Sequence, residues 1–428
     1  MPYIEWRGGS CRVKWWAGGY LPSGKKKYES ASGPAPGVPF QDETAAYNYG
    51  LDREHDVRHG KHISRSDRTT PMESYCWTWL AAQDLRPESV RRYTSILTNW
   101  IVPYWRSHGV GEITSLEYDA WKKYIQGKVG ASHAIGILSV FSMLMEDAVL
   151  EGMRSSSPVV KRRRRGRYVK KAREKKHPLD VETVYRLAVN AHTVWGYTGW
   201  TYIWTMAFTG MRTGEMWGLR REFAPPNWPA SDPDPERREE CVSRYTSMQA
   251  IRVQHQHQYV EGVATFTGPK YESHRTLVVP PFLAEMLGAL LASHDKAVVF
   301  PSMSGGYLLG ACNFGATYWW PISRGASARV GRKDTARPEI PSVPAMSGKR
   351  IYLLRHGHKE WLEDDGHLET PTEARMGHEI AGVKGLYGNV TPGMELRIIE
   401  TLQARWEKLL TSGVWLPPFP SRLPSQGS

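Results

Sequence analysis

The stretch Lys349-Arg-Ile-Tyr-Leu-Leu-Arg-His-Gly-His-Lys-Glu-Trp-Leu362 decides the fold prediction, together with the residues that follow it as far as Tyr387. Its apolar residues recur every three to four positions, which predicts a helix over 349–362. Tyr352 and Arg355 are three positions apart, so this helix would carry both side chains on one face. The search for a functional site therefore starts from an arginine on a helix.

A second, shorter helix is expected next, with a tyrosine beyond it. Thr370-Pro371-Thr372-Glu373 has the pattern of a capping box with proline at the first helical position, and Gly377 is placed to end the helix. His378 would then lie just past the helix end. Tyr387 lies in Gly385-Leu-Tyr-Gly388, where the glycines give the backbone freedom and leave the phenol poorly buried. An arginine, a histidine and a tyrosine at these intervals suit attack on a phosphodiester.

Upstream, Phe208-Thr-Gly-Met-Arg-Thr-Gly-Glu-Met-Trp-Gly-Leu219 places another arginine, Arg212, in a glycine-containing turn that leads into a helix. With it the set resembles the catalytic residues of the tyrosine recombinase (phage integrase) family. The residues that carry this resemblance, in chain order, are Arg212, Arg355, His378 and Tyr387. The resemblance covers roughly residues 178–410 well and the preceding segments more loosely.

The resemblance implies three further site residues. The family carries a lysine in a β-hairpin between the two arginines, and the segment 267–280 matches that hairpin with Lys270. The family usually has histidine three residues before the second arginine, where this chain has Tyr352. A phenol can donate a hydrogen bond to a phosphate oxygen but cannot carry a positive charge, so the role of Tyr352 is open. Glu215, three residues after the first arginine, is expected to orient an arginine.

The chemistry of these residues suits cleavage and rejoining of DNA. Arg212 and Arg355 would hold the phosphate, because guanidinium groups offer a planar fork of donors and remain charged. Tyr387 would be the nucleophile that forms a 3′-phosphotyrosyl link. Lys270 would protonate the leaving 5′-oxygen, and His378 would hydrogen-bond the phosphate or assist the tyrosine proton. We expect no metal and no nucleotide cofactor, because the covalent link preserves the energy of the broken bond.

Composition favours a DNA-binding protein of the cytoplasm. The chain has 428 residues, enough for two or three domains, a net charge of +13 and a pI near 9.4, which together favour a polyanionic partner. Charge alone does not separate DNA from RNA or a membrane surface. The four cysteines are scattered, as expected of free thiols. No apolar run approaches a membrane span and no secretory signal begins the chain, so we expect a cytoplasmic, nucleoid-associated bacterial protein without membrane contact.

We predict a mainly α fold with small β-sheets (α+β) in several domains. The boundaries are 1–63 for a β-sheet and helix domain, 71–158 for a helical bundle, 159–177 for a basic linker, 178–412 for the catalytic domain and 413–428 for a loose tail. The first two are similar to the arm-type and core-binding DNA domains of the family. A folded cap with a solvated basic edge and a plain bundle are the alternatives.

Local patterns predict the elements within these domains. Strands are expected at 3–7, 12–17 and 25–30 before a helix over 41–58, and the bundle helices at 72–84, 87–101, 116–126 and 133–151. Residues 64–70 read as a linker. Further strands are expected at 247–253, 260–266 and 275–279, a basic loop at 323–347 and an amphipathic helix beyond Tyr387. That helix would pack on a neighbouring protomer or within its own chain.

Basic residues in the N-terminal sheet and the linker are the candidate DNA contacts. Like charges in the run from Lys161 to Arg167 repel one another, so the run should be extended until phosphates neutralise it. A solvated segment is the alternative. The candidates are Lys14, Lys25, Lys26, Lys27, Arg162, Arg163, Arg164, Arg165, Arg167, Lys170 and Lys171.

The resulting hypothesis is an integrase-type recombinase that acts on double-stranded DNA attachment sites as a homotetramer, with a possible directionality factor. A type IB topoisomerase, which shares the covalent tyrosine chemistry, is one alternative. A DNA-binding accessory protein that has lost catalysis is the other. A covalent DNA adduct would separate an enzyme from the accessory protein.

Overall fold

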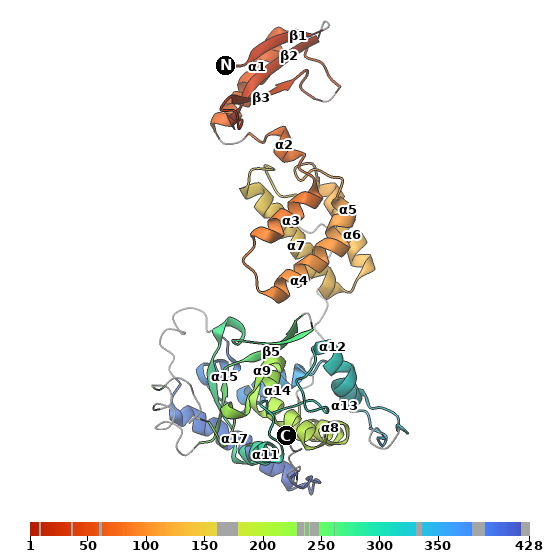
Figure 1. Cartoon of the computed structure of the whole chain (residues 1–428), viewed down its shortest axis with the longest axis vertical. Coiled ribbons are helices and arrows are strands. Elements are labelled where there is room, and N and C mark those ends of the chain that lie inside the picture. The colour runs from red at the N-terminus through yellow and green to blue at the C-terminus, as the bar shows by residue number, and fades with distance from the viewer. Residues whose placement is uncertain are drawn as a thin grey trace. The chain divides into compact units, whose positions relative to one another are not determined.

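A computed structural model gives the architecture of the chain and divides it into two compact units, Met1–Lys171 and Ala172–Ser428 (Figure 1). It describes all residues except 8–9, 36, 60–61, 161–178, 229–234, 236–238, 240–247, 261, 331–335, 379–389 and 421–428. Helices dominate, and the sheets are small and antiparallel. The predicted fold class is confirmed.

The first unit begins with a three-stranded sheet in the order β1-β2-β3, formed by β1 (Tyr3–Arg7), β2 (Ser10–Tyr20) and β3 (Lys26–Ala31). Helix α1 (Glu43–Arg58) packs against β2 and is capped by the Asp42 side chain. Along β2, buried Val13 and Trp15 alternate with partly exposed Arg12 and Lys14, as a strand with one covered face requires. The predicted strands and helix match these elements.

A helical bundle follows in the same unit. Its elements are α2 (Arg65–Arg68), α3 (Met72–Ala82), α4 (Pro87–Ile96), the π-helical turn η1 (Leu97–Ile101), α5 (Val102–Trp105), α6 (Ser115–Lys128) and α7 (Ala131–Leu150). Two expectations need correction. The expected linker at 64–70 contains the short helix α2, which is capped by Ser64. The predicted helix over 87–101 widens into a π turn just before Pro103, which has no backbone N–H to continue the ladder.

Helix α7 is long and apolar enough to cross a membrane by length and composition, which corrects the expectation that no segment reaches that length. Within the bundle, however, its apolar face is covered. Ile137, Phe141 and Leu144 are fully buried in a core that also contains Trp105 and Trp121. This burial is what a central helix of a helical bundle shows.

The second unit is organised around α8 (Val181–Thr209), which bends at Gly196 and ends at Gly210 in the left-handed conformation. Among the described helices that pack on it are α11 (Pro281–Ser293), α13 (Trp320–Arg324), α14 (Leu353–Asp364) and α17 (Pro392–Leu410). The α17 helix matches the predicted amphipathic helix and packs within its own chain. Its Trp406 ring stacks on Phe282 with ring centroids 4.4 Å apart.

Short elements surround this helical core. Strand β4 (Ala250–Val253) pairs with β7 (Arg275–Val278), and β5 (Gln256–Val260) pairs with β6 (Val263–Thr267). The other elements are α9 (Thr213–Gly218), η2 (Arg221–Phe223), η3 (Lys270–Glu272), α12 (Ala311–Phe314), η4 (Gly315–Trp319), α13 (Trp320–Arg324) and α15 (Glu369–Met376). The predicted hairpin over 267–280 is therefore not formed, because the strands on either side of it, β6 and β7, belong to different sheets.

Several predicted boundaries in this unit were wrong. Helix α14 begins at Leu353, four residues later than expected. Helix α15 begins at Glu369 after Leu368, so residues 370–373 do not form its capping box. The 323–347 segment is not a plain loop, because backbone bridges join Ala326 to Ile340 and Arg329 to Arg337. The predicted loose tail is partly held, since the Trp415 and Phe419 rings lie against α8.

Candidate active site

Arg212 is held at the start of α9 by contacts from three directions. The turn after α8 requires Gly210 at φ 65°, and a Cβ atom there would approach the His358 ring to 2.7 Å. The Arg212 guanidinium donates to Glu215 Oε1 at 2.8 Å, to Ser273 Oγ at 3.1 Å and to the Gly377 carbonyl at 2.8 Å. Its side chain is 17 % exposed, so it faces solvent with part of its surface.

Arg355 lies on α14 and is 1 % exposed. Its guanidinium donates to the Gly210 and Met376 carbonyls, and Nη2 also lies 3.0 Å from His378 Nε2. Burial, together with the nearby charge of Arg212, lowers the pKa of Arg355 to about 10. Arg355 therefore remains charged at neutral pH, and the charges of the two arginines act on each other.

His378 follows α15 directly, because Gly377 ends that helix at φ 65°. The His378 Nδ1 atom lies 2.6 Å from Glu373 Oε2, and the other oxygen of Glu373 accepts from Lys359. Burial would raise the pKa of Glu373, but the hydrogen bonds from Lys359 and His378 lower it. His378 is thus held between a carboxylate and a guanidinium.

A buried ion pair between Glu215 and Arg275 lies beside Arg212, which also donates to Glu215. Glu215 is 1 % exposed and accepts two hydrogen bonds from Arg275, at 3.0 and 2.7 Å. Burial alone would raise the pKa of Glu215, but Arg275 and the hydrogen bond from the Arg212 backbone lower it to about 2. Arg275 also donates to the Arg375 carbonyl. This pair connects β7, α9 and α15.

These contacts surround a cavity of about 560 Å³. Arg212, Arg275 and His378 line it, together with the 271–274 turn and the end of α15. Arg355 is behind His378 rather than at the cavity surface. Arg212 and Arg355, which are far apart in sequence, therefore converge on the same helix end. There they donate to the carbonyls of two consecutive residues, Gly377 and Met376.

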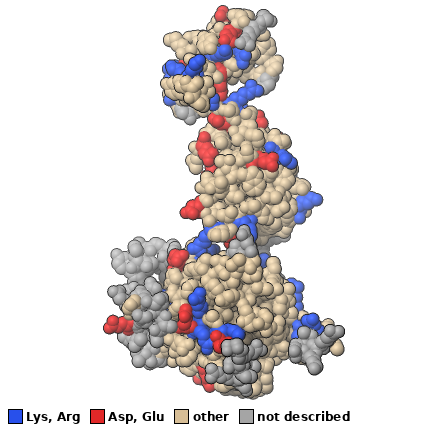
Figure 2. All heavy atoms as spheres, in the orientation of Figure 1, with Lys and Arg blue, Asp and Glu red and all other residues tan. Residues whose placement is uncertain are grey.

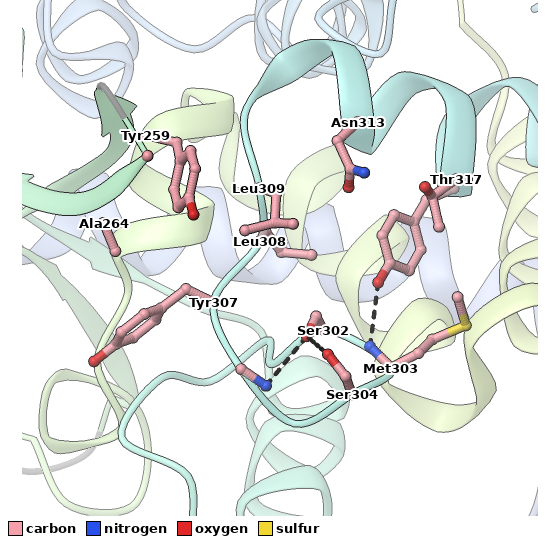
Figure 3. Close-up of a pocket in the computed structure, with 13 residues that line it drawn as sticks. Tyr259, Ala264, Ser302, Met303, Ser304, Tyr307, Leu308, Leu309, Asn313 and Thr317 are labelled. Carbon is pink, nitrogen blue, oxygen red and sulfur yellow. Dashed lines mark hydrogen bonds between the residues drawn. The ribbon is translucent and has the colours of Figure 1, made fainter.

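A second cavity, of about 540 Å³, lies between the β5–β6 hairpin, the 302–309 segment and α12 with η4 (Figure 3). Tyr259, Tyr307 and Tyr318 are among its lining residues, and the Tyr318 hydroxyl accepts from the Met303 backbone at 3.1 Å. None of its lining residues is charged. A phosphate needs cationic or donor groups, so the basic cavity is the better candidate for the active site.

Comparison with solved structures supports the fold through the Tn1549 integrase, whose TM-scores exceed 0.5. No family model matches the sequence, and no curated protein matches it. A lambda integrase dimer bound to a core site aligns with 90 % of this chain and 94 % of its own, at 13 % identity and a TM-score of 0.47. The Tn1549 transposon integrase bound to transposon right end DNA aligns at 12 % identity with a TM-score of 0.54, over 80 % of this chain and 100 % of its own. The chain shares the fold of the Tn1549 integrase.

A second Tn1549 integrase complex, with a circular intermediate DNA, gives a TM-score of 0.53 at 12 % identity, over 79 % of this chain and 99 % of its own. Lys270 lies in the turn η3 between β6 and β7, within the predicted 267–280 segment, but these two strands belong to different sheets and do not pair as a hairpin. It is exposed, and its Nζ atom lies 4.7 Å from the centre of the Tyr271 ring. Tyr271 lines the cavity and Lys270 does not, so the amine lies beside the site.

Tyr352 directly precedes α14. The centre of its ring lies 5.9 Å from the Arg355 guanidinium, and the ring packs edge-on against His356. The side chain is 38 % exposed. Tyr352 therefore contacts the buried arginine through its ring face.

The remaining predicted site residues lie either outside the described part of the chain or in the N-terminal sheet. Tyr387 and the linker residues Arg162, Arg163, Arg164, Arg165, Arg167, Lys170 and Lys171 lie outside the described residues. Over the β1–β3 sheet and α1, Figure 2 shows Lys and Arg side chains on the visible face. Lys25 and Lys26 are exposed beside the β2–β3 turn, Lys14 pairs with Glu5 and Lys27 donates to Ser66. No cluster of three or more His, Cys, Asp or Glu residues that would hold a metal occurs in the described part of the chain.

Sequence reasoning missed three residues of this site: Arg275, Glu373 and Lys359. Arg275 follows the Lys270 turn, but nothing in its local pattern says that its partner would be Glu215. Glu373 was interpreted as part of a capping box, whereas its side chain binds His378 and Lys359. The five-residue spacing from Glu373 to His378 across a helix end is the signal that would have indicated the pair.

Proposed function

We propose that the chain is a site-specific DNA recombinase that cuts and rejoins double-stranded DNA attachment sites through a covalent 3′-phosphotyrosyl intermediate, and so integrates or excises a mobile element. The observation that carries the proposal is the convergence of Arg212, Arg355 and His378 on one helix end beside a basic cavity. The fold, which is that of integrases solved in complex with DNA, agrees with it.

The arginines supply charge where the reaction develops it. Attack on a phosphodiester adds negative charge to the non-bridging oxygens, and fixed donors that point at those oxygens stabilise the transition state. Arg212 is partly exposed at the cavity and offers its fork directly. Arg355 would use the hydrogen that it now gives to His378, because its other hydrogen bonds go to fixed backbone carbonyls.

The remaining steps use a nucleophile and an acid. The Tyr387 oxygen would bond to phosphorus while the bond to the 5′-oxygen breaks, and Lys270 would give that oxygen its proton. Because Lys270 is exposed on a turn beside the cavity, it can move to the leaving group without disturbing packed structure. Rejoining reverses these steps with a 5′-hydroxyl from another strand.

Site recognition would come from the other parts of the chain. The N-terminal sheet presents Lys25 and Lys26 to solvent, and two-stranded or larger ribbons fit the major groove. The helical bundle and the basic linker would add phosphate contacts, which make affinity steeply salt-dependent. Strand exchange between two sites would need four protomers, and a directionality factor would bias integration or excision.

A trapping experiment tests the proposed function. Nicked duplexes with a randomised central segment would be incubated with the full chain, because loss of the short cleaved strand prevents rejoining. We expect covalent protein–DNA adducts that survive denaturation, and sequencing of the trapped DNA would give a selected duplex. An absence of adducts despite DNA binding would favour the accessory-protein alternative. Relaxation of supercoiled plasmid lacking the selected site would favour a type IB topoisomerase.

The acid role of Lys270 makes a separate prediction. Lys270→Ala should slow cleavage of the selected duplex by about 100-fold or more, the range that a positioned proton donor contributes. A 5′-bridging sulfur at the cleaved bond needs no protonation to leave, so it should restore the rate of the variant. Single-turnover cleavage measures both rates. A variant that stays slow on the sulfur substrate would exclude Lys270 as the acid.

A further inference from the structure

The contacts of His378 define which of its nitrogens carries the proton. Glu373 Oε2 can only accept, because hydrogen bonds from Lys359 and His378 lower the pKa of this carboxyl and keep it ionised. The Nδ1 atom of His378, at 2.6 Å, must therefore be the donor. On the other side, the Arg355 Nη2 atom can only donate, so Nε2 at 3.0 Å must be the acceptor. Both neighbours select the same tautomer, with hydrogen on Nδ1 and a lone pair on Nε2.

Glu373 is itself held in place. Lys359, on α14, donates to its second oxygen, and the His378 backbone N–H donates to the Glu373 carbonyl at 3.0 Å. The Glu373 side chain is 14 % exposed, whereas His378 is 39 % exposed and lines the cavity. The carboxylate thus lies behind the imidazole, on the side away from the cavity.

We propose that Glu373 is a positioning residue that holds His378 as a proton acceptor facing the cavity, so that His378 is the general base for the nucleophile and not a donor to the phosphate. This inference rests on the proposed function. It decides between the two roles that the sequence left open for His378. An imidazole with its proton directed away from the cavity cannot donate to a phosphate until it has first taken up a proton.

The proton transfers of the step balance. An arriving phosphate oxygen accepts the hydrogen bond that Arg355 Nη2 now donates to Nε2, so Arg355 keeps its proton and the Nε2 lone pair becomes free. The phenol hydrogen of the nucleophile moves to Nε2 as its oxygen bonds to phosphorus, and the bond from phosphorus to the 5′-oxygen breaks. Lys270 protonates that oxygen. Glu373 stabilises the imidazolium that results, as a carboxylate behind a catalytic histidine does.

This chain needs such a base more than a chain with histidine at position 352 would. Tyr352 cannot take up a proton near neutral pH. The other imidazole that lines the cavity, His274, lies 3.3 Å from Glu272 in the exposed 271–274 turn. Among the described histidines, His378 combines a place in the cavity wall with a partly buried carboxylate and an arginine on opposite ring nitrogens.

The test compares Glu373→Gln with Glu363→Gln. Glu363 contacts the same lysine, Lys359, at 3.6 Å but does not touch His378, which makes it the matched control. Glutamine at 373 can donate as well as accept, so the preference for hydrogen on Nδ1 should be lost. ¹⁵N NMR of histidine-labelled full chain, with His378 assigned through His378→Asn, reports the tautomer without any DNA.

Cleavage of the selected duplex gives the second readout. Glu373→Gln should cleave about 100-fold more slowly, as expected for a weakened general base, with DNA affinity within a few-fold of the parent. A 5′-bridging sulfur should not restore its rate, because the leaving group is not the step affected; Lys270→Ala provides the rescued comparison. Lys359→Met keeps the carboxylate but loses its anchor, and should show a smaller loss of the same kind if Glu373→Gln is unstable.

Each result of these experiments either supports or overturns the proposed role of Glu373. Loss of the Nδ1–H signal with slow, unrescued cleavage in Glu373→Gln, and parent behaviour in Glu363→Gln, would support the proposal. A retained Nδ1–H signal, an unchanged cleavage rate or rescue by sulfur would overturn it. A parent chain that forms no adduct at all would refute the proposed function, and the NMR spectrum would still show whether Glu373 sets the tautomer.

Discussion

Replacing Tyr387 by phenylalanine is expected to abolish covalent adduct formation while DNA binding stays within a few-fold of the parent. The substitution removes one hydroxyl, which is the atom that would bond to phosphorus, and leaves the ring and every cationic group in place. Trapping on the selected duplex followed by denaturing electrophoresis measures the adduct, and gel shift measures binding.

Tyr271→Phe is the matched control for this experiment. The Tyr271 phenol is 66 % exposed and lines the basic cavity, so it is the described tyrosine best placed to compete as nucleophile. We expect Tyr271→Phe to form adducts at nearly the parent rate. If instead Tyr387→Phe still traps DNA and Tyr271→Phe does not, the nucleophile has been assigned to the wrong residue.

The second large effect is expected on stability, from Glu215→Gln. Loss of this carboxylate would leave Arg275 buried without its charge partner and would weaken the support of Arg212. Removing one member of a buried ion pair costs about 3–5 kcal/mol. Urea denaturation of the full chain measures the change in the free energy of unfolding, and covalent adduct formation should fall with it.

Two further variants separate charge loss from a general effect of the substitution. Glu182→Gln removes a partner of Arg186 in an exposed pair, at 2.8 Å, and should change stability by about 0.5 kcal/mol or less. The double variant Glu215→Gln with Arg275→Met should recover part of the loss, because the uncompensated buried charge is gone. A single Glu215→Gln variant as stable as Glu182→Gln would show that the buried pair is not a stabilising element.

The same carboxylate predicts how stability depends on pH. The pKa of Glu215 in the folded chain is about 2, below the value of about 4.3 for an unfolded glutamate. Its contribution is therefore fully present above pH 4.3 and is lost as the pH falls toward 2, because the unfolded chain binds the proton first. Denaturation midpoints measured between pH 5 and pH 2.5 should fall less steeply in Glu215→Gln than in the parent.

Local patterns predicted the helices and strands well where period and capping residues agree. The α17 helix and the three N-terminal strands match because their apolar positions follow a single period. Helix starts were less predictable. Residues 370–373 look like a capping box, but Glu373 has a stronger interaction available with Lys359 and His378 across a helix end. Tertiary contacts of this kind have no signature in a local window.

In the candidate site, too, local patterns predicted some residues, whereas tertiary contacts determined others. Order and spacing were enough to select Arg212, Arg355 and His378, because family resemblance depends on those positions. Glu215, the buried partner of Arg275, lies 60 residues away in the sequence. The strands around Arg275 are divided between two separate strand pairs, an arrangement that no local pattern predicts. Lys270 lies in a turn within the predicted 267–280 segment, but the flanking strands β6 and β7 pair with other strands and not with each other.

The backbone that ends α15 couples the two arginines and His378 to one another. Met376 accepts from one arginine, Gly377 from the other, and the next residue carries the imidazole. A rotation of this short segment would unseat all three groups together, so partly assembled sites would be rare. The contacts of both arginines and the position of the imidazole therefore depend on one backbone conformation, that of residues 376–378.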